Sequence, residues 1–145
     1  MDLMTQSLHE YLGSLHWEDD EVPPVVPLGL FFEGNDEEES IAPNQWGYGR
    51  PSIASLYNRF KEIAARPDVS DVYVGLHQEW CDPEYADTFP PAETVFIVTS
   101  ADKSQVESWL TDLETDGVLQ GWPHGKPKNA PVPAKGHQVY WISWD

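Results

Sequence analysis

The first 49 residues contain no lysine or arginine, although 11 of them are aspartate or glutamate. Arg50 is the first basic side chain, and the whole chain has 25 acidic residues against 8 basic ones, a formal net charge of -17. A surface of this sign repels nucleic-acid phosphates, so we expect no nucleic-acid partner. The excess charge favours a basic protein partner, a cation or plain solvent as its counterpart.

Cysteine and long apolar runs are also scarce. Cys81 is the single cysteine, which excludes an intramolecular disulfide and fits a reducing compartment. No apolar run approaches the roughly 20 residues that a membrane helix needs. The first residues, MDLMTQSLHEYLG, lack the basic start and apolar centre of a signal peptide. We therefore expect a cytoplasmic protein without a membrane partner.

The length of 145 residues suits one domain, 1–145, with a core of its own. Apolar side chains at helical spacing predict a helix over about residues 2–15; they are Met4, Leu8, Tyr11, Leu12 and Leu15. The acidic run at 18–21 and the prolines after it end this helix. We thus divide the domain into an N-terminal helix with an acidic linker, 1–24, and a core, 25–145.

The core predicts alternating strands and helices. Strands are expected at 25–33, 72–80, 93–100 and 137–144, and helices from the N-cap Ser52 to Arg66 and from the N-cap Ser100 to Gly117. A proline-rich connection occupies 121–136. The order β-α-β-β-α-β is typical of the ferredoxin-like split βαβ arrangement, an α+β fold whose antiparallel sheet carries both helices on one face.

The strands around Phe31, Phe96, Val98, Tyr140 and Trp141 are apolar on both sides, so the sheet face away from the two helices is also expected to be apolar. Such a face needs a cover. The N-terminal helix is the favoured cover, and a second copy in a homodimer is the alternative.

Two acidic clusters are the candidate partner-binding residues: Glu18, Asp19, Asp20 and Glu21, and then Asp36, Glu37, Glu38 and Glu39. Nearby aromatic residues would anchor a partner: Trp46, Tyr48, Phe31 and Phe32. The simpler interpretation makes the acids a solvated loop and at least one of Phe31 and Phe32 core. The second cluster could also bind a hard cation such as calcium, but consecutive acids diverge and the 12-residue alternation of a calcium loop is missing.

His77, Glu79 and Cys81 alternate along an expected strand, so they could share one face with donors suited to zinc, joined by His16 or His124. The paired spacing of a specific zinc site is missing, and a half-exposed strand face explains the pattern equally. We therefore predict neither a metal nor a cofactor, and an inert thiol at Cys81.

Several strings resemble those of a family of small acidic bacterial proteins with no assigned chemistry: LFFEGNDEEESI at 30–41, RPDVSDV at 66–72, ETVFIVTSA at 93–101, GWPHGKPKNAP at 121–131 and the terminal WD. The resemblance begins at about residue 25. It implies a bacterial, intracellular, single-domain protein. A general similarity to toxin-immunity proteins rests on size and acidity alone.

Three functional hypotheses follow. The leading one is a non-enzymatic acidic domain that binds a basic protein, as an immunity protein would bind a nuclease toxin. The second is a small metal-dependent enzyme that uses His77, Glu79 and nearby acids beside the 81–92 loop. The third is a homodimeric housekeeping protein formed through the open sheet face.

Overall fold

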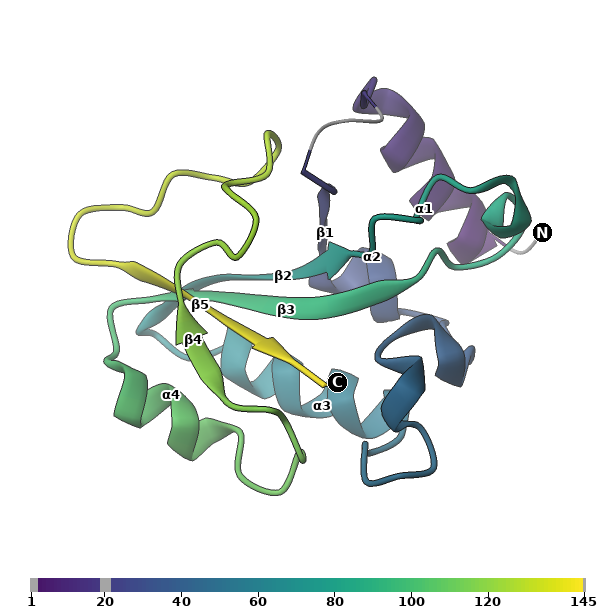
Figure 1. Ribbon diagram of the computed structural model, residues 1–145. Helices are drawn as coiled ribbons and strands as arrows, with labels where there is room; N and C mark the ends of the chain where they lie inside the picture. Colours follow the sequence, from purple (N-terminus) through teal and green to yellow (C-terminus); the bar gives the residue numbers. More distant parts are fainter. Residues whose placement is uncertain (1–2, 19–21, 145) are drawn as a thin grey trace.

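The computed structural model describes residues 3–18 and 22–144, which form a five-stranded antiparallel sheet with helices packed around it (Figure 1). The helices are α1 (Leu3–Ser14), α2 (Leu28–Phe32), α3 (Ile53–Ala64) and α4 (Lys103–Trp109). The strands are β1 (Val25–Pro27), β2 (Val69–Leu76), β3 (Ala92–Thr99), β4 (Val118–Gln120) and β5 (Gln138–Ser143). Short 3-10 helices are η1 (Glu38–Ser40), η2 (Pro43–Gln45) and η3 (Pro83–Tyr85).

The strand order is β1-β2-β3-β5-β4, and every neighbouring pair is antiparallel. A split βαβ unit would separate its first two strands, in parallel orientation, by another strand. Here Val26 of β1 pairs directly with Val74 of β2. The mixed α+β class is confirmed, whereas the ferredoxin-like topology is not.

β1 is much shorter than the strand expected over 25–33. The chain turns at Pro27 into α2, which contains both Phe31 and Phe32. The residues Phe31 and Phe32 are 0% and 2% exposed. The Phe32 ring stacks on the Tyr57 ring with centroids 5.3 Å apart, and it meets the Phe31 ring edge to face with centroids 5.2 Å apart. Successive side chains of a strand point to opposite faces, so the helical turn lets both phenylalanines enter one core. Neither is exposed as a partner anchor.

α1 and α3 lie where their apolar spacing predicts them. The Ser52 hydroxyl caps α3 by accepting a hydrogen bond from the Ser55 amide, as expected. α4 instead begins at Asp102, whose carboxylate accepts from the Gln105 amide while the Gln105 side chain accepts from the Asp102 amide. This capping box satisfies two amides where a Ser100 cap would satisfy one. None of the described helices is long and apolar enough to cross a membrane.

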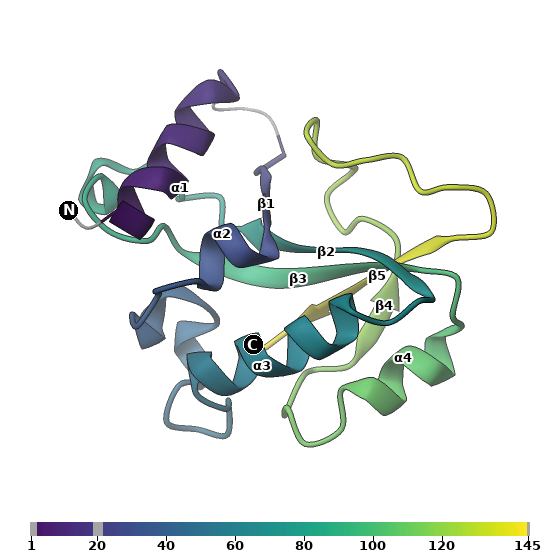
Figure 2. The same cartoon turned by 180° about the vertical axis from the view of Figure 1, so that it is seen from behind.

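The larger apolar cluster lies between the sheet and helices α2, α3 and α4; Figure 2 shows α3 and α4 below the sheet. Alternate residues of each strand contribute to it: Val72, Val74 and Leu76 of β2, Val95 and Ile97 of β3, and Tyr140 and Ile142 of β5. Leu8 and Leu12 of α1 belong to the same cluster. The period-two pattern of the strands therefore predicts this face correctly.

The other face is covered by residues 121–136, which we call the proline-rich strap. Ala130 and Trp122 of the strap pack on Phe96, with the Trp122 ring 4.8 Å from that of Phe96. The Asn129 side chain bonds both the amide and the carbonyl of Val25 at the sheet edge, at 3.1 and 2.7 Å. The expectation that the N-terminal helix covers this face is wrong, and the covered face no longer calls for a second copy.

Candidate functional site

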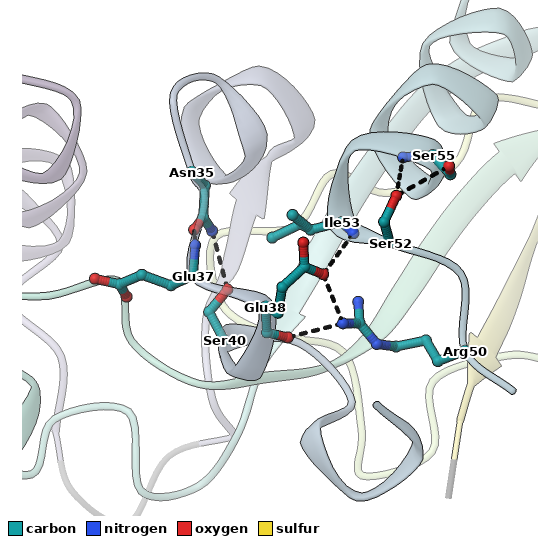
Figure 3. Close-up of polar contacts among 8 residues, drawn as sticks. All are labelled: Asn35, Glu37, Glu38, Ser40, Arg50, Ser52, Ile53 and Ser55. Atoms are coloured by element: carbon teal, nitrogen blue, oxygen red, sulfur yellow. Dashed lines mark hydrogen bonds and ion pairs between the residues drawn. The ribbon is translucent and has the colours of Figure 1, made fainter. Parts of the chain in front are cut away.

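The acidic loop after α2 is folded by Asn35, which is 8% exposed. Its amide nitrogen donates to the Phe31 carbonyl and the Ser40 hydroxyl, and its side-chain oxygen accepts from the Glu37 amide (Figure 3). An asparagine side chain can make these bonds at once because it carries both donors and an acceptor. Asn35 thereby fixes the backbone from which residues 36–39 project.

Glu38 is paired with Arg50, the first base of the chain. One Glu38 carboxylate oxygen, Oε1, accepts from Arg50 Nη2 at 2.9 Å and from the Ile53 amide at 2.8 Å, at the start of α3 (Figure 3). The Arg50 side chain is 0% exposed and its guanidinium lies 4.6 Å from the Trp46 ring centroid. Burial lowers the pKa of Arg50 from its usual value, while Glu38 opposes that shift. The expectation that residues 36–39 lack a local counter-charge is therefore wrong at Glu38.

Glu37 joins this loop to a second acidic segment. Its Oε2 atom accepts from the Thr88 hydroxyl at 2.8 Å and from the Phe89 amide at 3.1 Å. Both partners lie in the segment between β2 and β3, about 50 residues further along the chain. Glu37 is thus a tether between two loops as well as a surface carboxylate.

A groove opens between the two loops, and we call it the acidic groove. One wall comprises Glu37, Glu38, Glu39, Ser40 and Pro43, and the other comprises Glu84, Tyr85, Thr88, Phe89 and Pro91. Two of its carboxylates are held in place by the bonds described above, so little ordering of those side chains would accompany binding. Desolvation raises the pKa of Tyr85 above its usual value, and the nearby carboxylates of Glu84, Glu79 and Asp82 raise that pKa further.

Glu84 and Tyr85 were not among the candidate residues of the sequence analysis. The sequence does contain a signal for them: residues 67–102 include eight acidic residues and no lysine or arginine. The run is less dense than the first 49 residues, and its acids are separated by two strands. Only folding shows that both base-free segments contribute to one groove.

Several of the predicted partner-binding residues are exposed side chains. Asp36 and Glu39 are exposed, as are Trp46 at 39% and Tyr48 at 82%. Glu18 follows Trp17, whose ring lies under the Lys128 ammonium group of the strap. Glu37 of the other cluster instead bonds to Thr88, in the segment between β2 and β3. Among the described residues, Glu18 thus lies in a different environment from the loop at 36–39. Asp19, Asp20 and Glu21 lie outside the described residues.

The zinc candidates do not share a strand face, because β2 ends at Leu76 and His77, Glu79 and Cys81 lie on the following turn. His77 Nδ1 accepts a hydrogen bond from the Glu79 amide at 3.1 Å, so the neutral ring carries its proton on Nε2. That nitrogen is 3.9 Å from Glu93 Oε2. Within residues 3–18 and 22–144, no three His, Cys, Asp or Glu side chains are placed to hold a metal ion.

Comparison of the chain with known protein families gives a match. The family model described as "Uncharacterized protein YfbO family" matches residues 5–142. The chain belongs to the YfbO family. The match includes α1, so the resemblance does not begin near residue 25 as expected from the sequence strings. No curated protein and no solved structure shows a significant match.

The YfbO match includes both walls of the acidic groove, at 37–43 and 84–91. The family is described as uncharacterized, so it assigns no activity to these residues. The chemistry of the groove is therefore what points to a function.

Proposed function

We propose that the chain is a non-enzymatic protein-binding domain whose acidic groove docks a basic protein partner. The observation that carries this proposal is the meeting of Glu37, Glu38, Glu39 and Glu84 around one groove. Complementary charge accelerates encounter and selects among partners. Fixed carboxylates add affinity because less side-chain entropy is lost on binding.

Exposed aromatic residues on the turn that precedes Arg50 support the same function. Trp46 covers Arg50, which is bonded to Glu38, and Tyr48 is the most exposed large aromatic side chain described. Aromatic side chains supply much of the energy of protein interfaces. Charge would then guide the partner while Trp46 and Tyr48 contribute apolar contact.

One form of this function is immunity: the protein would neutralise a basic toxin by occupying its cationic active surface. The net charge of -17 supports a strongly basic target of this kind. A cytoplasmic location is part of the proposal, since a sequence with one cysteine has no second cysteine for an intramolecular disulfide and suits a reducing compartment.

The test reverses the exposed charges of Glu39 and Glu84 in the groove and of Asp36 next to it in the chain, and it spares the tethered carboxylates. The triple variant Asp36→Lys, Glu39→Lys, Glu84→Lys leaves the bonds of Glu37 and Glu38 intact. Its control, Glu62→Lys, Glu107→Lys, Asp116→Lys, makes the same charge change on exposed positions of α3, α4 and the loop before β4. Partners captured from a bacterial lysate are identified by mass spectrometry, purified and titrated by calorimetry.

We expect the groove variant to weaken partner binding at least about tenfold and the control less than about threefold. Equal losses in both variants would show that only net charge is sensed. Undiminished binding by the groove variant would refute the proposed site.

A further inference from the structure

The acidic groove does not end at Tyr85. Pro43, Tyr85 and Pro91 also line a second cavity, which contains His77, Glu79 and Glu93. Glu93 and Trp144 are shared in turn with a third cavity, which contains Thr94, Trp141 and His124. The three cavities adjoin through these shared residues, and together we call them the trough.

The trough is most acidic in its first two cavities, and Glu93, which the second and third cavities share, is the acidic residue of the third. Six glutamates line it, namely Glu37, Glu38, Glu39, Glu79, Glu84 and Glu93, and its described lining includes no lysine or arginine. His77 offers little compensation, because its Nδ1 is already an acceptor for the Glu79 amide. Each cavity therefore has at least one carboxylate available to a cationic group.

Thr94 provides an independent sign of a ligand at the far end of the trough. The residue is 6% exposed and lines the third cavity, on the same sheet face as Phe96. Its hydroxyl has no hydrogen-bond partner among the described residues. This hydroxyl is not among the fully buried atoms that lack a partner, so it reaches the surface of the cavity and is available to a group that enters there.

The trough also presents ring surfaces suited to the stems and heads of basic side chains. Tyr85, Trp141, Trp144 and three prolines line it. Cations of this chain already use such surfaces: Arg50, Lys61, Arg66 and Lys128 lie 4.6, 4.3, 4.2 and 5.4 Å from aromatic ring centroids. A cation over a ring gains energy in addition to its pairing with a carboxylate.

We propose that the trough holds an extended basic segment of the protein partner, with lysine or arginine side chains seated at Tyr85 and at Glu93. This inference rests on the proposed function and adds the form of the partner. The cavities follow one another through shared residues, so successive side chains of one extended segment can enter successive cavities. Three adjoining acidic cavities therefore match several side chains of one extended segment.

The test uses the full chain and a fluorescein-labelled peptide in which lysine and glycine alternate over about ten residues, at about 0.15 M salt. We expect Glu93→Gln to weaken peptide binding about fivefold or more, measured by fluorescence anisotropy. Thr94→Val, which removes only the hydroxyl at nearly constant shape, is expected to weaken it about threefold. Glu107→Gln on α4 is the charge-matched control and is expected to change it less than about twofold.

Equal effects of Glu93→Gln and Glu107→Gln would overturn the inference, because the peptide would then sense net charge alone. So would wild-type affinity in both Glu93→Gln and Thr94→Val. With the natural partner in hand, binding that is lost in the Asp36, Glu39, Glu84 variant but unchanged in Glu93→Gln would refute the extended segment and retain the proposed function. Partner binding that is unchanged in the Asp36, Glu39, Glu84 variant would refute the proposed function itself.

Discussion

Glu38 and Glu39 are neighbours along the chain, but only Glu38 is bonded to a buried cation. Its carboxylate joins the Arg50 guanidinium and the first amide of α3, whereas Glu39 is exposed. Arg50 also has two buried nitrogens, Nε and Nη1, without partners among the described residues. The bond to Glu38 is thus the main compensation for a buried positive charge.

Glu38→Ala is therefore expected to lower the free energy of unfolding by about 2–4 kcal/mol, since it leaves the Arg50 charge buried without a carboxylate. Glu39→Ala is expected to change it by less than about 0.5 kcal/mol. Urea denaturation measures both. Hydrogen exchange at the Ile53 amide should accelerate in the first variant alone, and equal destabilisation by the two substitutions would contradict the assigned role of Glu38.

The sequence predicts the candidate residues of the groove only in part. The charge run identifies Asp36, Glu37, Glu38 and Glu39, but it treats the four as equivalent. Glu38 is tethered because the turn at 41–50 brings Arg50 back to it, and Glu37 is tethered because Thr88, from a distant segment, bonds to it. Such long-range pairing has no local signature in the chain.

At the scale of elements, strong periodicity predicts type and position well. α1, α3, β2, β3 and β5 fall close to their expected ranges because each has a continuous apolar stripe or alternation. α2 and β4 have five and three residues, too few to show a period. The strap contains little regular structure, so only its contacts with Phe96 and Val25 identify it as a cover.

Asn129 connects three of these elements. It bonds both backbone groups of Val25 and also donates to the Tyr11 hydroxyl of α1 at 3.1 Å. The side-chain amide thereby takes the place of a further strand at the edge of β1. An edge strand with satisfied backbone groups is also less available for pairing with another chain.

Replacement of Asn129 by alanine is expected to cost about 2–3 kcal/mol of unfolding free energy, because the buried amide and carbonyl of Val25 lose their partners. Asn58→Ala on the exposed face of α3 is the matched control, with an expected change of less than about 0.5 kcal/mol. Thermal and urea melts measure the stability, and hydrogen exchange at Val25 locates the change. An Asn129 variant as stable as the control would exclude the proposed connection.

At the scale of the whole molecule, the charges are separated along the sheet. The groove loops lie at one end, while residues 117–144, which contain three lysines and no acidic residue, include the strap at the opposite end in both views (Figures 1 and 2). Carboxylates of the two base-free segments are therefore crowded together. Their mutual repulsion opposes folding unless salt or a partner reduces it.

We expect the thermal midpoint to rise by roughly 3–8 °C as sodium chloride is increased from about 0.02 to about 0.5 M, because salt screens this repulsion. Calorimetry measures the midpoint. The variant Asp36→Asn, Glu39→Gln, Glu84→Gln should start from a higher midpoint and respond less to salt. A midpoint that falls with salt would mean that attractive pairs outweigh the repulsion.

The position of β5 has a consequence for biosynthesis. This strand follows every other described element along the chain, yet it lies between β3 and β4 inside the sheet. While residues 138–143 are still within the ribosome, β3 has one open edge and β4 has no partner strand. The nascent chain must therefore remain soluble with an incomplete sheet, and its dense negative charge provides the repulsion between chains that this interval requires.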